Sequence, residues 1–71
     1  MSAAATTAEC RSHLELLTSE RALALETTLR DDRAYMADLE EEILSTRHAY
    51  VASAVVEIAR LREDLVGAYE G

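Results

Sequence analysis

The chain lacks proline, phenylalanine and tryptophan, and its two glycines stand near the end, at Gly67 and Gly71. Glycine and proline mark most tight turns, and an all-β domain needs turns at close intervals. Because the first 66 residues contain neither, the sequence excludes a sheet of short strands and favours long helices. A hydrophobic fraction of 49% argues against a wholly disordered chain.

Lysine is also absent, so all seven basic residues are arginines. Fourteen acidic residues outnumber them and give a net charge of −7. A surface with this charge repels a phosphate backbone. We therefore expect no direct binding to nucleic acid.

Cysteine occurs once, at Cys10, so the chain cannot form an internal disulfide, which fits a reducing compartment. No apolar run approaches the roughly 20 residues that span a bilayer. The first residues lack the basic and hydrophobic regions of a signal peptide. These features predict a cytoplasmic protein that does not contact membranes.

The strongest pattern lies between residues 36 and 69, where apolar residues recur in steps of three or four, the period of one helix face. This line consists of Met36, Leu39, Ile43, Tyr50, Ala54, Ile58, Leu61, Leu65 and Tyr69. A second line lies one residue further on, at Leu44, Val51, Val55 and Val66. From Val51 onward the two lines merge into one broad stripe, which predicts a long amphipathic helix.

The N-terminal part predicts another helix. Residues 1–5 are expected to be disordered, and residues 6–71 to form one helical domain. Thr6 with Glu9, or Ser12 with Glu15, fits a capping box at the helix start. The apolar line is narrower here and is interrupted by Arg21; it consists of Cys10, Leu14, Leu17, Leu25 and Leu29.

The most polar stretch, residues 26–33, is the best candidate for a turn, with Asp31 or Asp32 as the N-cap of a second helix. A fold-back there places Arg21 opposite the acidic run Glu40-Glu41-Glu42, with Glu41 as the pairing residue. It also places Arg47 opposite Glu15. This pairing favours an all-α antiparallel helical hairpin. The alternative is a single helix of about 60 residues, about 90 Å long.

In the hairpin the second helix is longer than the first, and residues after about 55 extend beyond it. Exposed apolar surface costs about 25 cal/mol per Å². We therefore expect the hairpin to dimerise, most simply into a four-helix bundle. The predicted interface residues are Val51, Val55, Ile58, Leu61, Leu65 and Tyr69.

Catalytic and cofactor motifs are missing: there is no nucleophile elbow and no glycine-rich phosphate loop. We expect no enzyme activity and no cofactor. A bundle that binds a metal through Cys10, His13 and His48 is a rival interpretation, although structural zinc normally takes four such ligands.

The function that the sequence favours is protein–protein interaction by a small acidic regulatory or adaptor protein, which binds itself and another protein. Two alternatives stay open. One is a purely structural oligomerisation module. The other is an acidic inhibitor that blocks the nucleic-acid or effector site of a partner.

Overall fold

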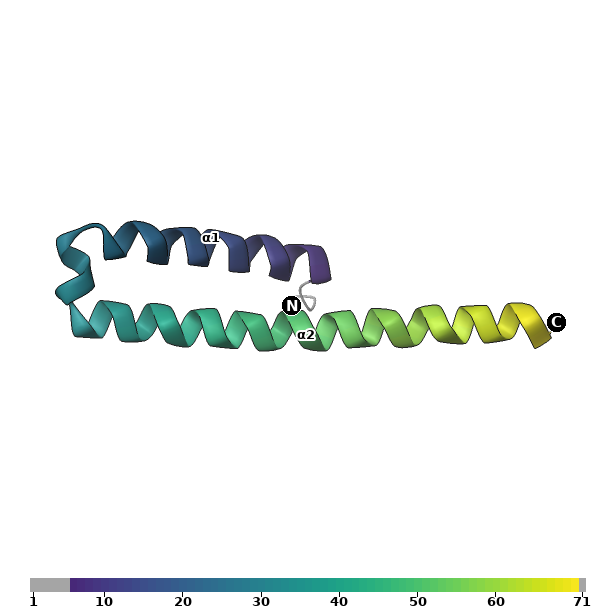
Figure 1. The fold of residues 1–71 in the computed structure, drawn as a ribbon. Helices are drawn as coiled ribbons and strands as arrows, with labels where there is room; N and C mark the ends of the chain where they lie inside the picture. Colours follow the sequence, from purple (N-terminus) through teal and green to yellow (C-terminus); the bar gives the residue numbers. More distant parts are fainter. Residues whose placement is uncertain (1–5, 71) are drawn as a thin grey trace, which may run out of the picture.

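Two antiparallel helices form the molecule (Figure 1), as seen in the computed structural model, which describes residues 6–70 and their side chains as far as Gly67. Helix α1 spans Thr7–Leu25, a short 3-10 helix η1 spans Thr28–Asp31, and α2 spans Arg33–Glu70. Residues 6–70 contain no strand. The all-α helical hairpin is therefore confirmed, and the single continuous helix is wrong. Residues 1–5, for which we expected disorder, lie outside the described residues.

Helix α1 begins at the first of the two predicted capping boxes. The Thr6 hydroxyl accepts a hydrogen bond from the Glu9 backbone N–H at 3.1 Å, and the Glu9 carboxylate accepts one from the Thr6 N–H at 3.2 Å. These two bonds satisfy N–H groups that have no carbonyl partner at a helix start. Threonine at position 6 therefore fixes where the chain becomes helical.

The turn is built by threonine and aspartate side chains, without glycine or proline. The Thr27 hydroxyl donates to the Ala24 carbonyl at 3.0 Å and accepts from the Leu29 N–H at 3.1 Å. Asp32 then caps α2, because its carboxylate accepts from the Tyr35 N–H at 3.0 Å. None of the described residues needs a positive φ to reverse the chain. The predicted turn in residues 26–33 is confirmed, with Asp32 as the N-cap.

The two helices meet along a narrow apolar seam. Leu17 from α1 packs with Leu39 and Ile43 from α2, and Leu14 and Tyr35 lie against this cluster. The buried residues of α1 stand seven apart, and on α2 the buried and half-buried positions from Leu39 to Ser53 follow steps of four and three, which is the heptad pattern of a coiled coil. The buried residues are Cys10, Leu17, Ala24, Leu39 and Ile43.

Three leucines predicted for this seam lie outside it. Leu25 and Leu29 are exposed at the turn, and Leu44 is exposed on α2. The heptad phase explains the difference: three residues after Arg21 the seam reaches Ala24, so the next residue, Leu25, is rotated by about 100° away from α2. The small side chain of Ala24 is the one buried there.

The molecule is elongated, with extents of 61 × 26 × 14 Å and a Cα radius of gyration of 17.4 Å. A compact domain of this length has a radius of gyration of about 11 Å. The difference arises because α2 has 38 residues and α1 only 19, so α1 accompanies α2 for about half of its length (Figure 1). Neither helix of the described chain has both the length and the apolar character that a membrane crossing requires.

Candidate functional site

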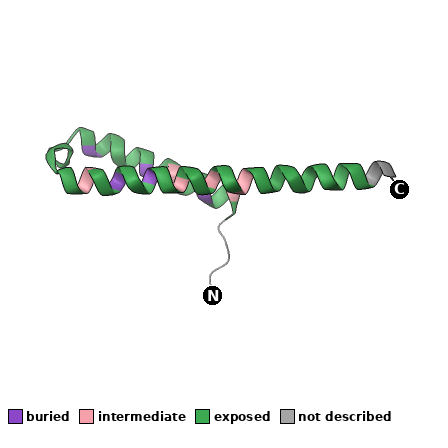
Figure 2. Ribbon diagram, turned by 90° about the horizontal axis from the view of Figure 1, so that it is seen from below, coloured by how far each residue is buried: buried purple, intermediate pink, exposed green. Residues whose placement is uncertain are grey.

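Within the described residues, no helix lies beside the second half of α2. We call residues 54–67 the free half, because α1 begins near the middle of α2 (Figure 1). Almost every residue of the free half is exposed (Figure 2), and its large apolar side chains are between 49% and 61% accessible. These side chains are Val55, Val56, Ile58, Leu61, Leu65 and Val66. They form the largest run of exposed apolar residues in the part of the chain that the structure describes.

The apolar face of the free half is not a continuation of the face that binds α1. The heptad positions that face α1 run along α2 as far as the half-buried Tyr50 and Ser53. The next three positions in the same heptad are polar: Glu57, Arg60 and Asp64. The residue that follows each of them is apolar: Ile58, Leu61 and Leu65. One residue corresponds to a rotation of about 100° in a helix. The free half therefore turns a polar side towards the direction of α1 and an apolar side about 100° away from it.

This divergence corrects the prediction of a single stripe from Met36 to Tyr69. That line combines seam residues such as Ile43 with residues of the other face such as Ile58. The line stays apolar because it contains two consecutive steps of four, from Tyr50 to Ala54 and from Ala54 to Ile58. A heptad alternates steps of three and four, so the extra step of four rotates the line around the helix, away from the face that contacts α1. The structure shows two faces, one occupied by α1 and one without a partner.

A shallow hollow lies on the apolar side of the free half, lined by Val55, Ile58, Ala59 and Arg62. These residues stand at positions i, i+3, i+4 and i+7. The small side chain of Ala59 leaves this part of the helix surface shallow. The hollow lies to one side of the line through Ile58, Leu61 and Leu65, because residues 55, 59 and 62 are rotated away from Leu61 around the helix.

The predicted interface residues all belong to α2, at the end of the half beside α1 and along the free half. Val51, at the end of the accompanied half, is exposed on the same side as Ile58, seven residues later. Val55, Leu61 and Leu65 are exposed beside them. The side chain of Tyr69 lies outside the described residues.

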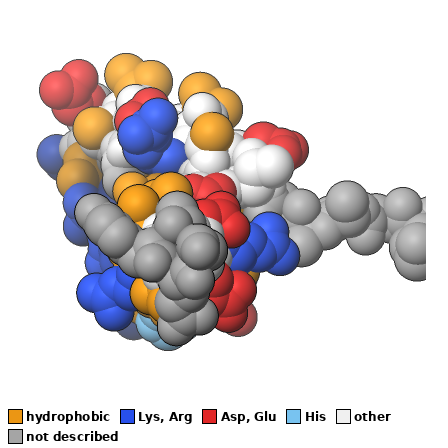
Figure 3. All heavy atoms as spheres, turned by 90° about the vertical axis from the view of Figure 1, so that its right-hand side faces the viewer, with side chains coloured by type: hydrophobic (Ala, Val, Ile, Leu, Met, Phe, Trp, Pro, Cys, Tyr) orange, Lys and Arg blue, Asp and Glu red, His pale blue; other side chains and the backbone are white. Residues whose placement is uncertain are grey.

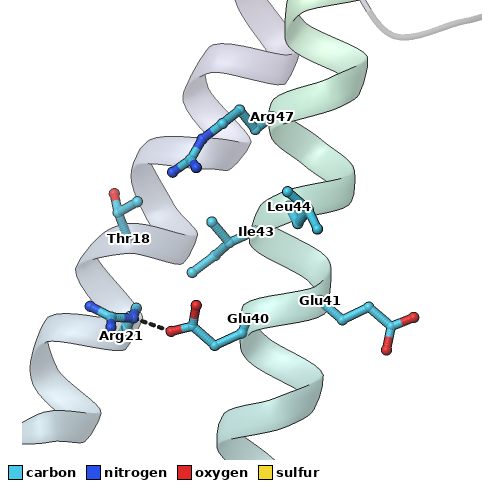
Figure 4. A pocket seen from close by; sticks show the side chains of 7 residues that line it. All are labelled: Thr18, Arg21, Glu40, Glu41, Ile43, Leu44 and Arg47. Atoms are coloured by element: carbon cyan, nitrogen blue, oxygen red, sulfur yellow. Dashed lines mark hydrogen bonds and ion pairs between the residues drawn. The ribbon is translucent and has the colours of Figure 1, made fainter.

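Arg21 lies at the rim of the seam and pairs with Glu40, as Figure 4 shows. The predicted partner, Glu41, points away from α1 in the same view. The correction has a simple geometric reason. Glu40 directly follows the seam residue Leu39, and the next residue is turned a further 100° away from α1. Both side chains of the observed pair are about half exposed, at 45% and 52%.

The second predicted pair, Glu15 with Arg47, is not among the ion pairs of the described residues. Arg47 reaches towards α1 and lines an open hollow with Thr18 and Ile43 (Figure 4). The contact that the structure shows nearby is His13 Nε2 to Glu42 Oε1 at 3.4 Å, which is an ion pair when His13 is protonated. A polar contact still joins the helices here, through different residues.

Tyr35 adds a hydrogen bond between the helices close to the turn. Its hydroxyl donates to Glu20 Oε2 at 2.6 Å. This bond raises the pKa of Tyr35, because it stabilises the protonated phenol; partial burial and the negative charge of Glu20 act in the same direction. No local pattern in the sequence indicates this contact, because the two residues are 15 positions apart.

The rival metal site would join Cys10, His13 and His48. Cys10 is buried in the seam, whereas His13 is exposed and contacts Glu42. Among residues 6–70, no group of three His, Cys, Asp or Glu side chains is placed to hold a metal ion. The geometry therefore gives this interpretation no support.

The outer side of α1 also carries exposed apolar residues. Leu16 and Leu23 are 69% and 66% accessible, and hydrophobic side chains lie on the upper side of the molecule in Figure 3, among acidic and basic ones. These two leucines are seven residues apart, with the polar Ser19 and Glu20 between them. This patch is smaller and more interrupted than the apolar side of the free half.

Comparisons with protein-family models, with curated proteins and with solved structures find no match for the chain.

Proposed function

We propose that the protein is a helical protein–protein interaction module that acts as a homodimer, with the free half of α2 as its docking element and with a regulatory or adaptor role. The observation that carries this proposal is the exposure of large apolar side chains on a helix half without a neighbour. Each buried Leu, Ile or Val side chain gains about 1.5–3 kcal/mol over an exposed one. A second helix that covers these side chains therefore supplies substantial binding free energy.

The distribution of charge supports a docking role for the free half. In residues 6–53, ten acidic and five basic side chains give −5, whereas residues 54–67 hold three acidic and two basic side chains and give −1. A nearly neutral apolar helix pairs with little repulsion. The acidic hairpin beside it favours partners that present a basic rim.

The dimer that we propose joins two hairpins through their free halves, so that the assembly contains four helices and the two α2 helices make the contact between the copies. Two other functions remain as alternatives to the adaptor role: a purely structural oligomerisation module, and an acidic inhibitor of a partner's nucleic-acid or effector site. Both use the same dimer and differ only in what the dimer binds.

The test is Leu61→Asp, compared with Leu16→Asp as the matched control. Both leucines are more than 60% exposed, but only Leu61 lies on the free half. A buried Leu at two symmetric positions contributes about 3–6 kcal/mol, so Leu61→Asp should weaken the dimer about 10²- to 10⁴-fold. Sedimentation equilibrium at micromolar concentration measures this loss, and circular dichroism checks that helicity is kept.

The control should dimerise like the unchanged protein. An unchanged protein that is monomeric and fully helical throughout the micromolar range would refute the proposal, and so would equal effects of the two substitutions. Capture experiments on the same variants separate the alternatives. An adaptor loses its partner with Leu61→Asp, a structural module has no partner to lose, and an inhibitor competes with DNA for its partner.

A further inference from the structure

We propose that the free half docks on the free half of a second copy in parallel and in register, as a two-stranded coiled coil sealed by Glu57 of each chain and Arg62 of the other. This inference rests on the proposed homodimer and specifies its orientation. It draws on two observations: the identity of the apolar residues at each heptad position and the placement of the charges beside them.

The core positions of this coiled coil are read from the exposed apolar side. Positions a are Val51, Ile58 and Leu65, and positions d include Ala54 and Leu61. In parallel dimers, β-branched residues at a with leucine at d favour two strands. Val51 and Ile58 with Leu61 follow that rule. Ala54 is small enough to let the two helices approach each other closely at the layer next to the hairpin.

The flanking charges are complementary in the parallel arrangement. Glu57 stands at position g and Arg62 at position e, five residues later. In a parallel coiled coil, position g of one helix lies beside position e of the next heptad on the other helix. Two-fold symmetry gives this pair twice. Neither side chain forms an ion pair with another described residue. Glu57 stands between the docking side and the side facing α1, where it borders a hollow with Thr6 and Thr7.

The antiparallel arrangement brings like charges together. If the helices are antiparallel and Ile58 is opposite Leu61 of the other copy, the g positions of the two chains face each other. Glu57 then lies near Asp64 of the other copy, twice in the dimer. Like charges at these positions repel and select against the arrangement.

The parallel arrangement has one cost, because it places two hairpins of charge −5 at the same end of the dimer. Salt screens exposed charges over about 8 Å at physiological ionic strength. In this dimer, the α1 helix of each hairpin also lies to the side of the dimer interface, because α1 occupies a face of α2 about 100° from the docking face. The Glu57–Arg62 pairs at the dimer interface are closer together than the charges spread over the two hairpins. These pairs therefore decide the orientation.

The first test is the sign of the effect of Glu57→Arg on the dimer dissociation constant. In the parallel dimer this change puts two arginines together on each side, and it should weaken the dimer about 3- to 30-fold. Arg62→Glu should weaken it similarly, and the double reversal should recover most of the loss. Glu63→Arg is the matched control, because it changes the net charge equally at position f, away from the seam.

The second test reads the orientation directly, in the full chain with Cys10→Ser. Ala54→Cys should form a disulfide between two copies in a glutathione redox buffer, because position 54 lies beside itself only in the parallel dimer. In the antiparallel dimer residue 54 lies beside residue 65, so a mixture of Ala54→Cys and Leu65→Cys chains would give the mixed disulfide instead. Mass spectrometry identifies the product.

The results distinguish this inference from the proposed function. A dimer that forms the mixed disulfide, or that tightens with Glu57→Arg, overturns the parallel arrangement and leaves the homodimer intact. A chain that stays monomeric overturns both. The 54–54 disulfide, together with a loss for Glu57→Arg that exceeds the loss for Glu63→Arg, supports the parallel dimer.

Discussion

Two adjacent leucines on α1 give the most direct test of the hairpin. Leu17 is 5% exposed and packs on Leu39 and Ile43, whereas Leu16 is 69% exposed on a side of the same helix that is rotated by about 100°. Truncation of a buried leucine to alanine costs about 2–5 kcal/mol. The core here is one narrow seam that can partly close around a cavity, so we expect about 2–3 kcal/mol for Leu17→Ala. Leu16→Ala should change the free energy of unfolding by less than about 0.5 kcal/mol.

A chain of 71 residues is typically stable by only about 4–10 kcal/mol, so the loss at Leu17 removes a large share of the total. Urea unfolding followed by circular dichroism measures the difference. Both variants must be compared at one protein concentration, because the apparent stability of an associating protein depends on concentration. Equal losses for the two variants would refute the assignment of the buried face. A loss at Leu16 alone would mean that α1 packs through its other side.

Two further predictions concern contacts between the helices. Removal of Arg21 and Glu40 singly and together, by alanine substitution, should show a coupling of about 0.2–1 kcal/mol in urea unfolding, as expected for a half-exposed ion pair. The same cycle with Glu41 in place of Glu40 should show no coupling, and equal couplings would contradict the observed pairing. The raised pKa of Tyr35 implies stability that is fully present below pH 10, the ordinary pKa of tyrosine, and is lost as pH rises through the folded-state pKa. Glu20→Gln should lower the Tyr35 pKa in an NMR titration of the tyrosine Cζ resonances, with Glu41→Gln as the control, and an unchanged titration would show that the hydrogen bond does not form.

The hairpin was predictable because several local signals agree. The capping box at Thr6, the polar stretch around Asp32 and the acids opposite Arg21 all indicate two helices that fold back on each other. The identity of the ion-pair partner was not predictable with the same accuracy. A run of three glutamates offers three candidates. Glu40 and Glu42 each stand next to a buried residue and flank the two sides of the seam, where they contact Arg21 and His13, whereas Glu41 lies between them on the outer side.

The division of α2 into two faces was harder to infer. From Val51 onward so many residues are apolar that steps of three and four can be drawn in more than one way. The seam stops along α2 where α1 begins, at Thr7, and that point is set by the sequence of α1. The polar residues Glu57, Arg60 and Asp64 were the available signal, because they continue the heptad of Leu39 and Ile43 without a break.

The continuity of α2 also affects the order in which the chain folds and associates. Starting a helix fixes several residues for one hydrogen bond, whereas each residue added to an existing helix gains one. Because α2 runs unbroken from Arg33 to Glu70, the free half can grow from a helix that the hairpin has already stabilised. Hairpin closure involves one chain and does not depend on concentration. For the dimer that we propose, this order means that the docking helix is formed before a second molecule arrives, and association is expected at the rates of preformed partners, about 10⁵–10⁷ M⁻¹s⁻¹, without a folding step.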